Sequence, residues 1–317
     1  MPDISKAAII QTTRRRLIKG ASAALMSGAM PHRAAATSGE AVGDPTVGRQ
    51  LIFDEPFTKI DMEIWNAGPK ATRAAQGHYG RAAFSRFGGE EGFDPYAIID
   101  DPEAENGKAL QITAKYIGRP MHITNYYGNT NPEMQWIAGN IQTGRMDGTV
   151  SRGWRNGYFE TRIRFPRHPL TFPAFWLLNR DCILRPQQSV EVDIVEHKGW
   201  EPYIYGAHIH EWGQPGERGD GTGVHPRVDL TTQYHRYGAL IDGAHCIPFF
   251  NRTQVRSPQT GQPIAWTIAR APILDATQDV FWPLITLALN TDPVFPRPLL
   301  PEHHEAHMQV DYFRVYA

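Results

Sequence analysis

The sequence predicts an all-β sandwich or barrel. From Leu51 onward it contains no stretch with the sustained 3.6-residue apolar period of an amphipathic helix. It contains instead many short runs that alternate apolar and polar residues or are rich in β-branched and aromatic residues, and both kinds favour strands. Clusters of Gly, Pro, Asn and Asp separate these runs, as turns separate strands. This combination is typical of β-sandwiches and barrels.

The expected strands follow one another along the chain with such turns between them. They are residues 109–114, 157–165, 174–178, 190–196, 203–210, 235–241, 247–250, 281–289 and 308–316. Segments 117–137 and 213–223 are expected to be loops. In the first of these loops Tyr126, Tyr127 and Trp136 either stack on the apolar face of a sugar or simply hold the loop in place.

The N-terminus carries the features of an export signal. Arg14–Arg16 precede a short, weakly apolar run, and three alanines end at residue 36. This pattern resembles a twin-arginine signal, although a disordered basic tail is the alternative. We therefore expect residues 1–36 to be the signal of a periplasmic or secreted protein. Residues 37–50 are then a short flexible lead-in, and residues 51–317 form a single domain.

Charge and composition exclude several classes of protein. The 317 residues include 32 basic and 33 acidic ones, and residues 1–36 hold six of the basic and one of the acidic residues. The rest of the chain therefore has 26 basic against 32 acidic residues and a net charge of −6, which excludes general nucleic-acid binding. The longest apolar run is about half as long as a membrane span requires, so no membrane partner is expected. Two cysteines, Cys182 and Cys246, form no disulfide framework, and whether they pair is open.

One predicted strand combines strong β propensity with three acids. In residues 189–197, SVEVDIVEH, Glu191, Asp193 and Glu196 are separated only by valine and isoleucine. Alternation places Glu191 and Asp193 on one face of a regular strand and Glu196 on the other. A one-residue β-bulge between Asp193 and Glu196 would bring all three acids to the same face, and such bulges often lie beside active sites.

Three acids on one face have a chemical use. Carboxyl groups packed this closely cannot all ionise freely, so one of them stays protonated and available as a general acid. A retaining glycosidase needs such an acid about 5–5.5 Å from a nucleophilic carboxylate, and the two ends of this motif can meet that requirement. The alternatives are a solvent-facing acidic strand and a cation site made of oxygen ligands.

The same stretch resembles a family signature. EVDIVE at 191–196 resembles the bulged E-x-D-x-x-E motif of glycoside hydrolase family 16. Other segments resemble further strands of that family and occur in the same order. They are FDEPF at 53–57 with Trp65, GKALQITA at 107–114, GYFETRI at 157–163 with PAFWLL at 173–178, LALN at 287–290 and VDYFRVY at 310–316. The resemblance covers roughly residues 51–317, and the ordered set is more specific than any one of its pieces.

The resemblance implies a fold and an activity. The fold is a jelly-roll β-sandwich of two antiparallel sheets with a concave glycan-binding cleft, here the catalytic domain of a monomer. The activity is that of a retaining endo-acting β-glycanase, which hydrolyses a polysaccharide such as a β-glucan, a galactan or a bacterial exopolysaccharide by double displacement. By residue-for-residue transfer Glu191 is the nucleophile, Glu196 the acid and base, and Asp193 the partner that orients the nucleophile.

The resemblance also implies substrate-binding and metal-binding residues. Trp176 matches a tryptophan of the cleft and His210 a histidine that faces the same site, while Trp154 is a further candidate for substrate binding. From the residues alone, Trp176 also fits an ordinary core position, and His208 and His210 fit metal ligands that lack an evident third partner.

A structural calcium ion is the cofactor that the resemblance suggests, and none is expected for catalysis. In some relatives an acid at the position of Asp311 helps to bind calcium together with main-chain oxygens, here those of Pro56 and Gly107.

Two features leave the substrate open. Many relatives that act on β-1,3-glucans carry Trp-Pro and a Gly just before the first Glu, and this chain has ILRPQQSV at 183–190 instead. Arg145, Arg152 and Arg185 fit an anionic polysaccharide or ordinary surface positions. A transglycosylase with the same carboxylates and a non-catalytic lectin-like sandwich are the alternative functions. The presence of all three carboxylates favours an enzyme.

Overall fold

The computed structural model describes residues 41–69, 78–79, 82–124, 130–145, 147–180, 183, 189–212, 218–269, 279–290 and 300–317. All of them fall within one compact unit. The export signal predicted for residues 1–36 lies outside the described residues. Within the described ranges, no helix has the length and apolar character that a membrane span requires.

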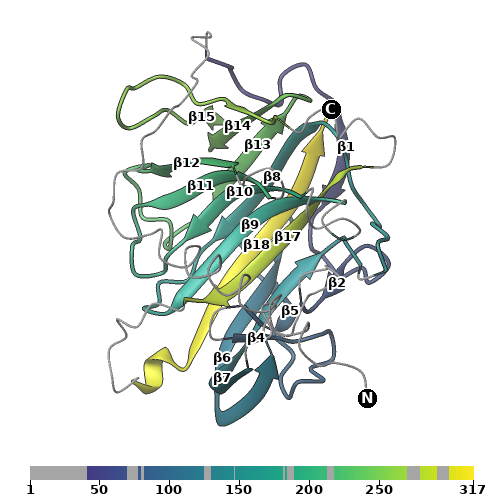
Figure 1. The fold of residues 1–317 in the computed structure, drawn as a ribbon. Coiled ribbons are helices and arrows are strands. Elements are labelled where there is room, and N and C mark those ends of the chain that lie inside the picture. Colours follow the sequence, from purple (N-terminus) through teal and green to yellow (C-terminus); the bar gives the residue numbers. More distant parts are fainter. Residues whose placement is uncertain are drawn as a thin grey trace, which may run out of the picture. The chain divides into compact units, whose positions relative to one another are not determined.

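The first of two sheets contains the acidic strand near its middle. Its strands are antiparallel and follow the spatial order β12, β11, β10, β9, β17, β7, β2. They span Arg218–Val224 (β12), Tyr205–Glu211 (β11), Val190–His197 (β10), Thr171–Asn179 (β9), Phe281–Leu289 (β17), Thr130–Gln142 (β7) and Asn66–Ala67 (β2). Figure 1 shows β9, β10 and β11 side by side.

The second sheet packs against the first and is also antiparallel. Its main order is β5, β6, β18, β8, β13, β14, with β1 paired to the end of β18 and β15 and β16 paired to β14. The bounds are Tyr96–Asp100 (β5), Lys108–Thr124 (β6), Glu305–Tyr316 (β18), Gly157–Arg164 (β8), His235–Ile241 (β13), His245–Phe250 (β14), Leu51–Glu55 (β1), Thr253–Gln254 (β15) and Trp266–Thr267 (β16).

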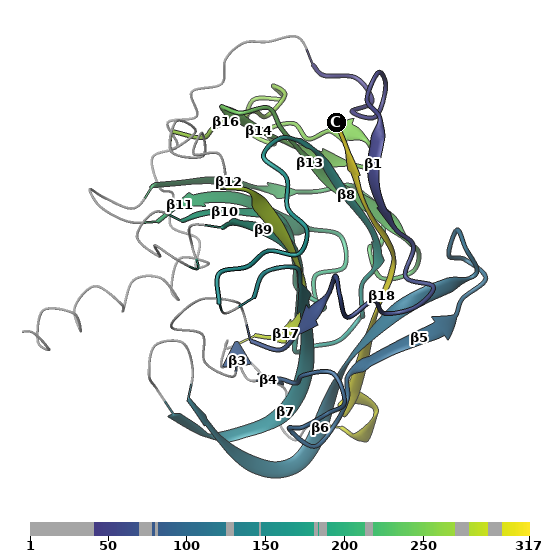
Figure 2. The ribbon, with the colours of Figure 1, turned by 90° about the vertical axis from the view of Figure 1, so that its right-hand side faces the viewer.

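The two sheets are joined by the β6–β7 hairpin. Figure 2 shows the two layers edge on, with β6 and β7 bending from one layer into the other. Two short strands lie beside this hairpin, β3 (His78–Tyr79) and β4 (Ala82–Phe84), and β4 runs parallel to β7. A 3₁₀ turn, Pro301–His303, precedes β18.

The core lies between the sheets because each strand turns its apolar side chains inward. Phe175 and Leu177 of β9 and Ile209 of β11 join Ile163 of β8 and Phe313 of β18 in one buried cluster. Their neighbours along each strand alternate to the opposite face. This is the predicted jelly-roll β-sandwich of two antiparallel sheets, and the fold prediction is confirmed.

Two segments expected to be loops contain strand instead. Residues 117–137 include the end of β6 and much of β7, and residues 218–223 belong to β12. The first misled the prediction because aromatic and polar residues mix within it without a period of two. The second has the sequence RGDGTGV, in which alternate glycines weaken the strand signal. Tyr126 and Tyr127 lie outside the described residues.

One of the two cysteines, Cys246, lies among the described residues. Cys246 of β14 is a free, fully buried thiol, and burial raises its pKa far above the usual range. Cys182 lies outside the described residues. The thiol of Cys246 is therefore inert and serves the core as a small apolar side chain.

Two buried histidines should make stability depend on pH. Burial lowers the pKa of His168 and His197 to about 4, against 6.5 in an exposed histidine, and the ring of His197 stacks on Phe165 at 4.8 Å. Below pH 6.5 the unfolded chain binds protons that the folded chain does not. The free energy of unfolding should therefore fall between about pH 6.5 and pH 4, by up to about 3 kcal/mol per histidine.

Urea unfolding at pH 7 and pH 4.5 checks this expectation. His197→Gln should show a smaller drop in unfolding free energy between the two pH values than the wild type. The matched control is His225→Gln, which changes an exposed histidine and should keep the full drop. Equal drops in the wild type and His197→Gln would contradict the assignment.

Candidate active site

A β-bulge brings the three acids of β10 to one face. Across β11, Asp193 faces His208 but Glu196 faces Gly206, so three steps on β10 match two on β11. The register with β9 also shifts by one residue, between Asp193 and Val195. Ile194 and Val195 both enter the core, with 2% and 0% exposure. The predicted bulge is therefore confirmed, and it turns Glu196 to the same face as the other two acids.

Each of the two glutamates meets a ring nitrogen that lies on, or just beyond, the neighbouring strand β11. The indole Nε1–H of Trp212, one residue beyond β11, donates to Oε2 of Glu191 at 2.8 Å. Nδ1 of His208 lies 2.9 Å from Oε2 of Glu196. Both glutamates remain partly exposed, so each can meet a substrate while one of its oxygens is held in place.

Asp193 lies between the glutamates and is more deeply buried. Its side chain is 6% exposed, and its Oδ2 lies 3.4 Å from Nε2 of His210. The rings of His208, His210 and Trp212 stack in series, with centroids 6.0 and 5.1 Å apart. A row of three rings, two on β11 and one just beyond its end, therefore runs beside the row of three acids on β10, one ring to each acid.

Sequence reasoning identified His210 but missed the roles of His208 and Trp212. The signal was present in HIHEW at 208–212, where a period of two puts His208, His210 and Trp212 on one face. Pairing these rings with individual acids requires the register of the β10–β11 hairpin and the position of the bulge, neither of which composition reveals.

Trp176 lies on the face of the acids. It pairs with Asp193 across β9 and β10, and its ring is half buried in a small apolar cluster outside the main core. Its Nε1–H donates to Oγ1 of Thr286 at 2.9 Å, and Thr286 donates to Oδ1 of Asn140 at 2.8 Å. This chain of hydrogen bonds fixes the indole, which suits a ring that stacks on a sugar.

Trp154 lies elsewhere. Its ring packs on Phe53, Phe159 and Phe313 at centroid distances of 5.1 to 6.1 Å, among the aromatic side chains of the core. It also borders a surface hollow with Arg152. The structure therefore does not bring Trp154 beside the acids, because its partly buried ring packs against the main core instead.

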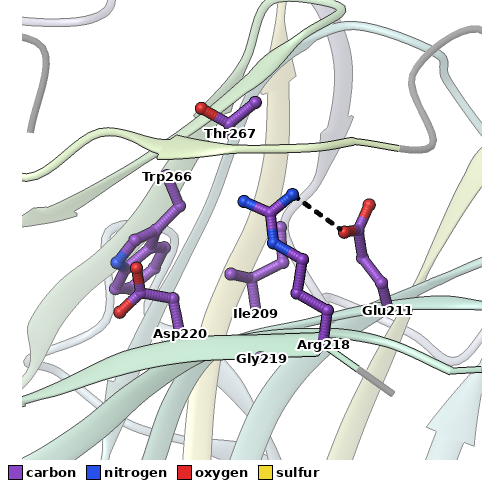
Figure 3. Close-up of a pocket in the computed structure, with 7 residues that line it drawn as sticks. All are labelled: Ile209, Glu211, Arg218, Gly219, Asp220, Trp266 and Thr267. Carbon is purple, nitrogen blue, oxygen red and sulfur yellow. Dashed lines mark ion pairs between the residues drawn. The ribbon is translucent and has the colours of Figure 1, made fainter. Parts of the chain in front are cut away.

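The opposite face of β11 and β12 carries a separate group of polar side chains. Figure 3 shows Arg218 and Glu211 pointing toward each other beside Trp266, and their closest charged atoms are 3.8 Å apart. Glu211 is buried and alternates with His210, so it points away from the acids of β10. This pocket supports the β11–β12 pairing and is not part of the acidic site.

The predicted calcium position does not fit a metal ion. Asp311 is fully buried, and its carboxylate forms an ion pair with the guanidinium of Arg162 and accepts the backbone N–H of Glu105 at 3.0 Å. The carbonyl of Gly107 accepts the N–H of Asp101. A calcium ion bound to Asp311 and to the carbonyls of Gly107 and Pro56 would have to displace Arg162, which already neutralises the acid.

The fold and the acidic face together define a class. A jelly-roll sandwich that presents two glutamates and an aspartate from one bulged strand has the paired carboxyl groups of a glycoside hydrolase. No family model matches the chain. The chain is 30% identical to endo-1,3-1,4-beta-glycanase EglC of Rhizobium meliloti (strain 1021) over 71% of its own length and 40% of the relative's.

Solved structures share the fold. A glycoside hydrolase family 16 endo-glucanase from Bacteroides ovatus superposes with a TM-score of 0.59 at 16% identity, over 84% of this chain and 100% of that one. A LamA variant from Z. galactanivorans, solved with laminaritriose and laminaritetraose, superposes with a TM-score of 0.60 at 16% identity, over 84% and 99%. The chain is thus similar in sequence to endo-1,3-1,4-beta-glycanases and in fold to an endo-glucanase of glycoside hydrolase family 16. It spans about two fifths of the length of the Rhizobium relatives that it matches.

Proposed function

We propose that the protein is a retaining endo-acting β-glycanase. The observation that carries this proposal is the single face on which Glu191, Asp193 and Glu196 lie, with a separate aromatic ring beside each acid. The partners differ, since an indole can only donate a hydrogen bond whereas an imidazole can donate or accept one. Different partners suit carboxyl groups with different tasks.

The proposed cycle has two displacements. Glu196 gives its proton to the glycosidic oxygen while an oxygen of Glu191 attacks the anomeric carbon. The bond between that carbon and the leaving sugar breaks, and an ester to Glu191 forms. Glu196, now a carboxylate, takes a proton from water as the water attacks the anomeric carbon and releases Glu191. Trp212 holds Oε2 of Glu191 and so leaves Oε1 as the attacking oxygen.

The proposed substrate is a β-linked glucan or a related polysaccharide. The two Rhizobium relatives are named endo-1,3-1,4-beta-glycanases, and laminari-oligosaccharides occupy the LamA variant. Trp176, held by Thr286 on the same face as the acids, supplies an aromatic surface for a sugar ring. Since such polymers are extracellular, we also propose that residues 1–36 export the protein. We further propose that it acts as a monomer. A transglycosylase would use the same acids with a sugar hydroxyl in place of water.

Product stereochemistry tests the mechanism. Purified protein is first assayed for new reducing ends on lichenan, laminarin, agar, carrageenan and bacterial exopolysaccharides. On the polymer that is cleaved, ¹H NMR of the first-formed product should show the β anomer, because two displacements restore the starting configuration. An α anomer would exclude the double displacement. Cleavage of none of these polymers would count against the proposed activity.

A further inference from the structure

The ring of His208 is confined by one glycine of its own strand, β11, and one glycine of the neighbouring strand β12. A Cβ added to Gly206 would lie 2.6 Å from Cε1 of His208. A Cβ added to Gly221 of β12 would overlap Cδ2 of the same ring. Real Cβ atoms do not make such contacts, so these two positions have no room for a larger residue while the ring stays where it is. Gly221, one of the β12 glycines that obscured this strand in the sequence, therefore makes space for the ring.

The confined ring of His208 contacts a single oxygen of Glu196. Nδ1 of His208 lies 2.9 Å from Oε2 of Glu196, and the two side chains are 28% and 26% exposed. The bulge places Glu196 opposite Gly206, two residues from His208 and on the same face. The contact thus depends on three features that the chain maintains together, namely the bulge and the two glycines.

We propose that His208 is a positioning residue that assigns different tasks to the two oxygens of Glu196. Its Nδ1–H donates to Oε2, so the proton that Glu196 exchanges with the substrate is carried by Oε1. This inference rests on the proposed function, in which Glu196 is the acid and base.

The tautomer follows from the cycle. After the first displacement Glu196 is a carboxylate, which accepts hydrogen bonds and donates none. Only a protonated Nδ1 can keep the contact with Oε2 in that state and in the acid state. His208 then retains its proton throughout, and one proton moves in each displacement: Oε1 gives its proton to the leaving sugar, and the attacking water later supplies a new proton to Oε1. No additional proton donor or acceptor is needed.

Leaving-group dependence separates this role from a structural one. For His208→Leu, kcat/KM on the polysaccharide should fall about 10- to 100-fold, the loss expected when a hydrogen bond to a charged group is removed. With the 2,4-dinitrophenyl β-glycoside of the oligosaccharide that the wild type releases, kcat/KM should change less than about twofold, because dinitrophenolate departs without a proton. His208→Asn keeps an N–H donor near Nδ1 and should recover much of the activity. Equal losses on both substrates, or a loss on neither, would overturn the proposal.

A second pair of variants leaves His208 itself unchanged. Gly221→Ala should push the ring off Glu196 and produce the same selective loss on the polysaccharide. Gly223→Ala is the matched control, since it lies on the same strand and face and its added Cβ would meet nothing closer than 3.4 Å. It should leave both activities near wild type. A normal Gly221→Ala enzyme would show that the position of the ring does not matter.

A readout without activity keeps the two proposals apart. Long-range ¹H–¹⁵N NMR of the histidine rings should show Nδ1 of His208 protonated at neutral pH, with a shift that changes in Glu196→Ala and Gly221→Ala. If the wild type cleaves no polymer, the proposed function fails while this measurement still tests the hydrogen bond. An unprotonated Nδ1 would overturn the positioning role even in an active enzyme.

Discussion

Glu191→Gln is expected to lower the cleavage activity at least about 10³-fold while the fold persists. Glutamine keeps an oxygen for the indole N–H of Trp212, which donates to Oε2 of Glu191 at 2.8 Å, but its amide is a poor nucleophile and the ester to the sugar cannot form. Circular dichroism and the urea midpoint should stay near wild type. Glu201→Gln, a change away from β10, is the matched control and should keep full activity.

Added azide distinguishes the nucleophile from the acid. With a dinitrophenyl β-glycoside, Glu191→Ala leaves room for azide to attack the anomeric carbon directly, and the product should be the α-azide. In Glu196→Ala the ester to Glu191 still forms, and azide should resolve it to the β-azide. NMR of the glycosyl azides reads the outcome, and the opposite pairing of variants and products would exchange the two roles.

Arg252→Ala should cause a large loss of stability, about 3–5 kcal/mol in the free energy of unfolding. Glu160 is fully buried in the second sheet, and both its oxygens accept hydrogen bonds from Arg252 at 2.9 Å. The hydroxyls of Tyr158 and Tyr312 donate to the same carboxylate at 2.9 and 2.8 Å. Removing the guanidinium leaves a buried charge whose remaining partners are neutral.

Urea unfolding at pH 7 measures this loss. Arg256→Ala is the matched control, because Arg256 is an exposed arginine of the same region with a hydrogen bond to the carbonyl of Gly261. It should change the unfolding free energy by less than about 0.5 kcal/mol. A similarly small effect for Arg252→Ala would contradict the importance assigned to this ion pair.

The acidic strand was predictable because its signals are local. Valine and isoleucine fix the extended backbone, and the spacing of Glu191, Asp193 and Glu196 requires a bulge if all three are to share a face. The ring partners were not predictable in the same way, since the contact of His208 with Glu196 depends on register across a hairpin. The glycines of β12 led to the prediction of a loop. The need for Gly221 comes from the ring of His208 on the neighbouring strand β11, which the sequence of β12 does not reveal.

The partner of Asp311 was not predictable for a related reason. An aspartate in VDYFRVY gives no sign of which cation will compensate it, and the cation here is Arg162 from the adjacent strand β8. Likewise Trp154 follows Arg152 and Gly153 in a turn-like segment, yet its ring packs on Phe53 and Phe313, which are distant from it in the sequence. Both contacts join residues far apart in the chain, which no local pattern records.

The bulge also bears on how the length of this strand can vary. Ile194 and Val195 enter the core together, so deleting either one would restore strict alternation and would still leave three acids facing outward. The same deletion would empty a side-chain volume between the sheets and draw the last acid along the strand. An evolving lineage could therefore lose a residue here without reversing the face of its acids, provided that a larger neighbour filled the vacated space. The extra residue thus contributes to core packing as well as to the placement of the acids.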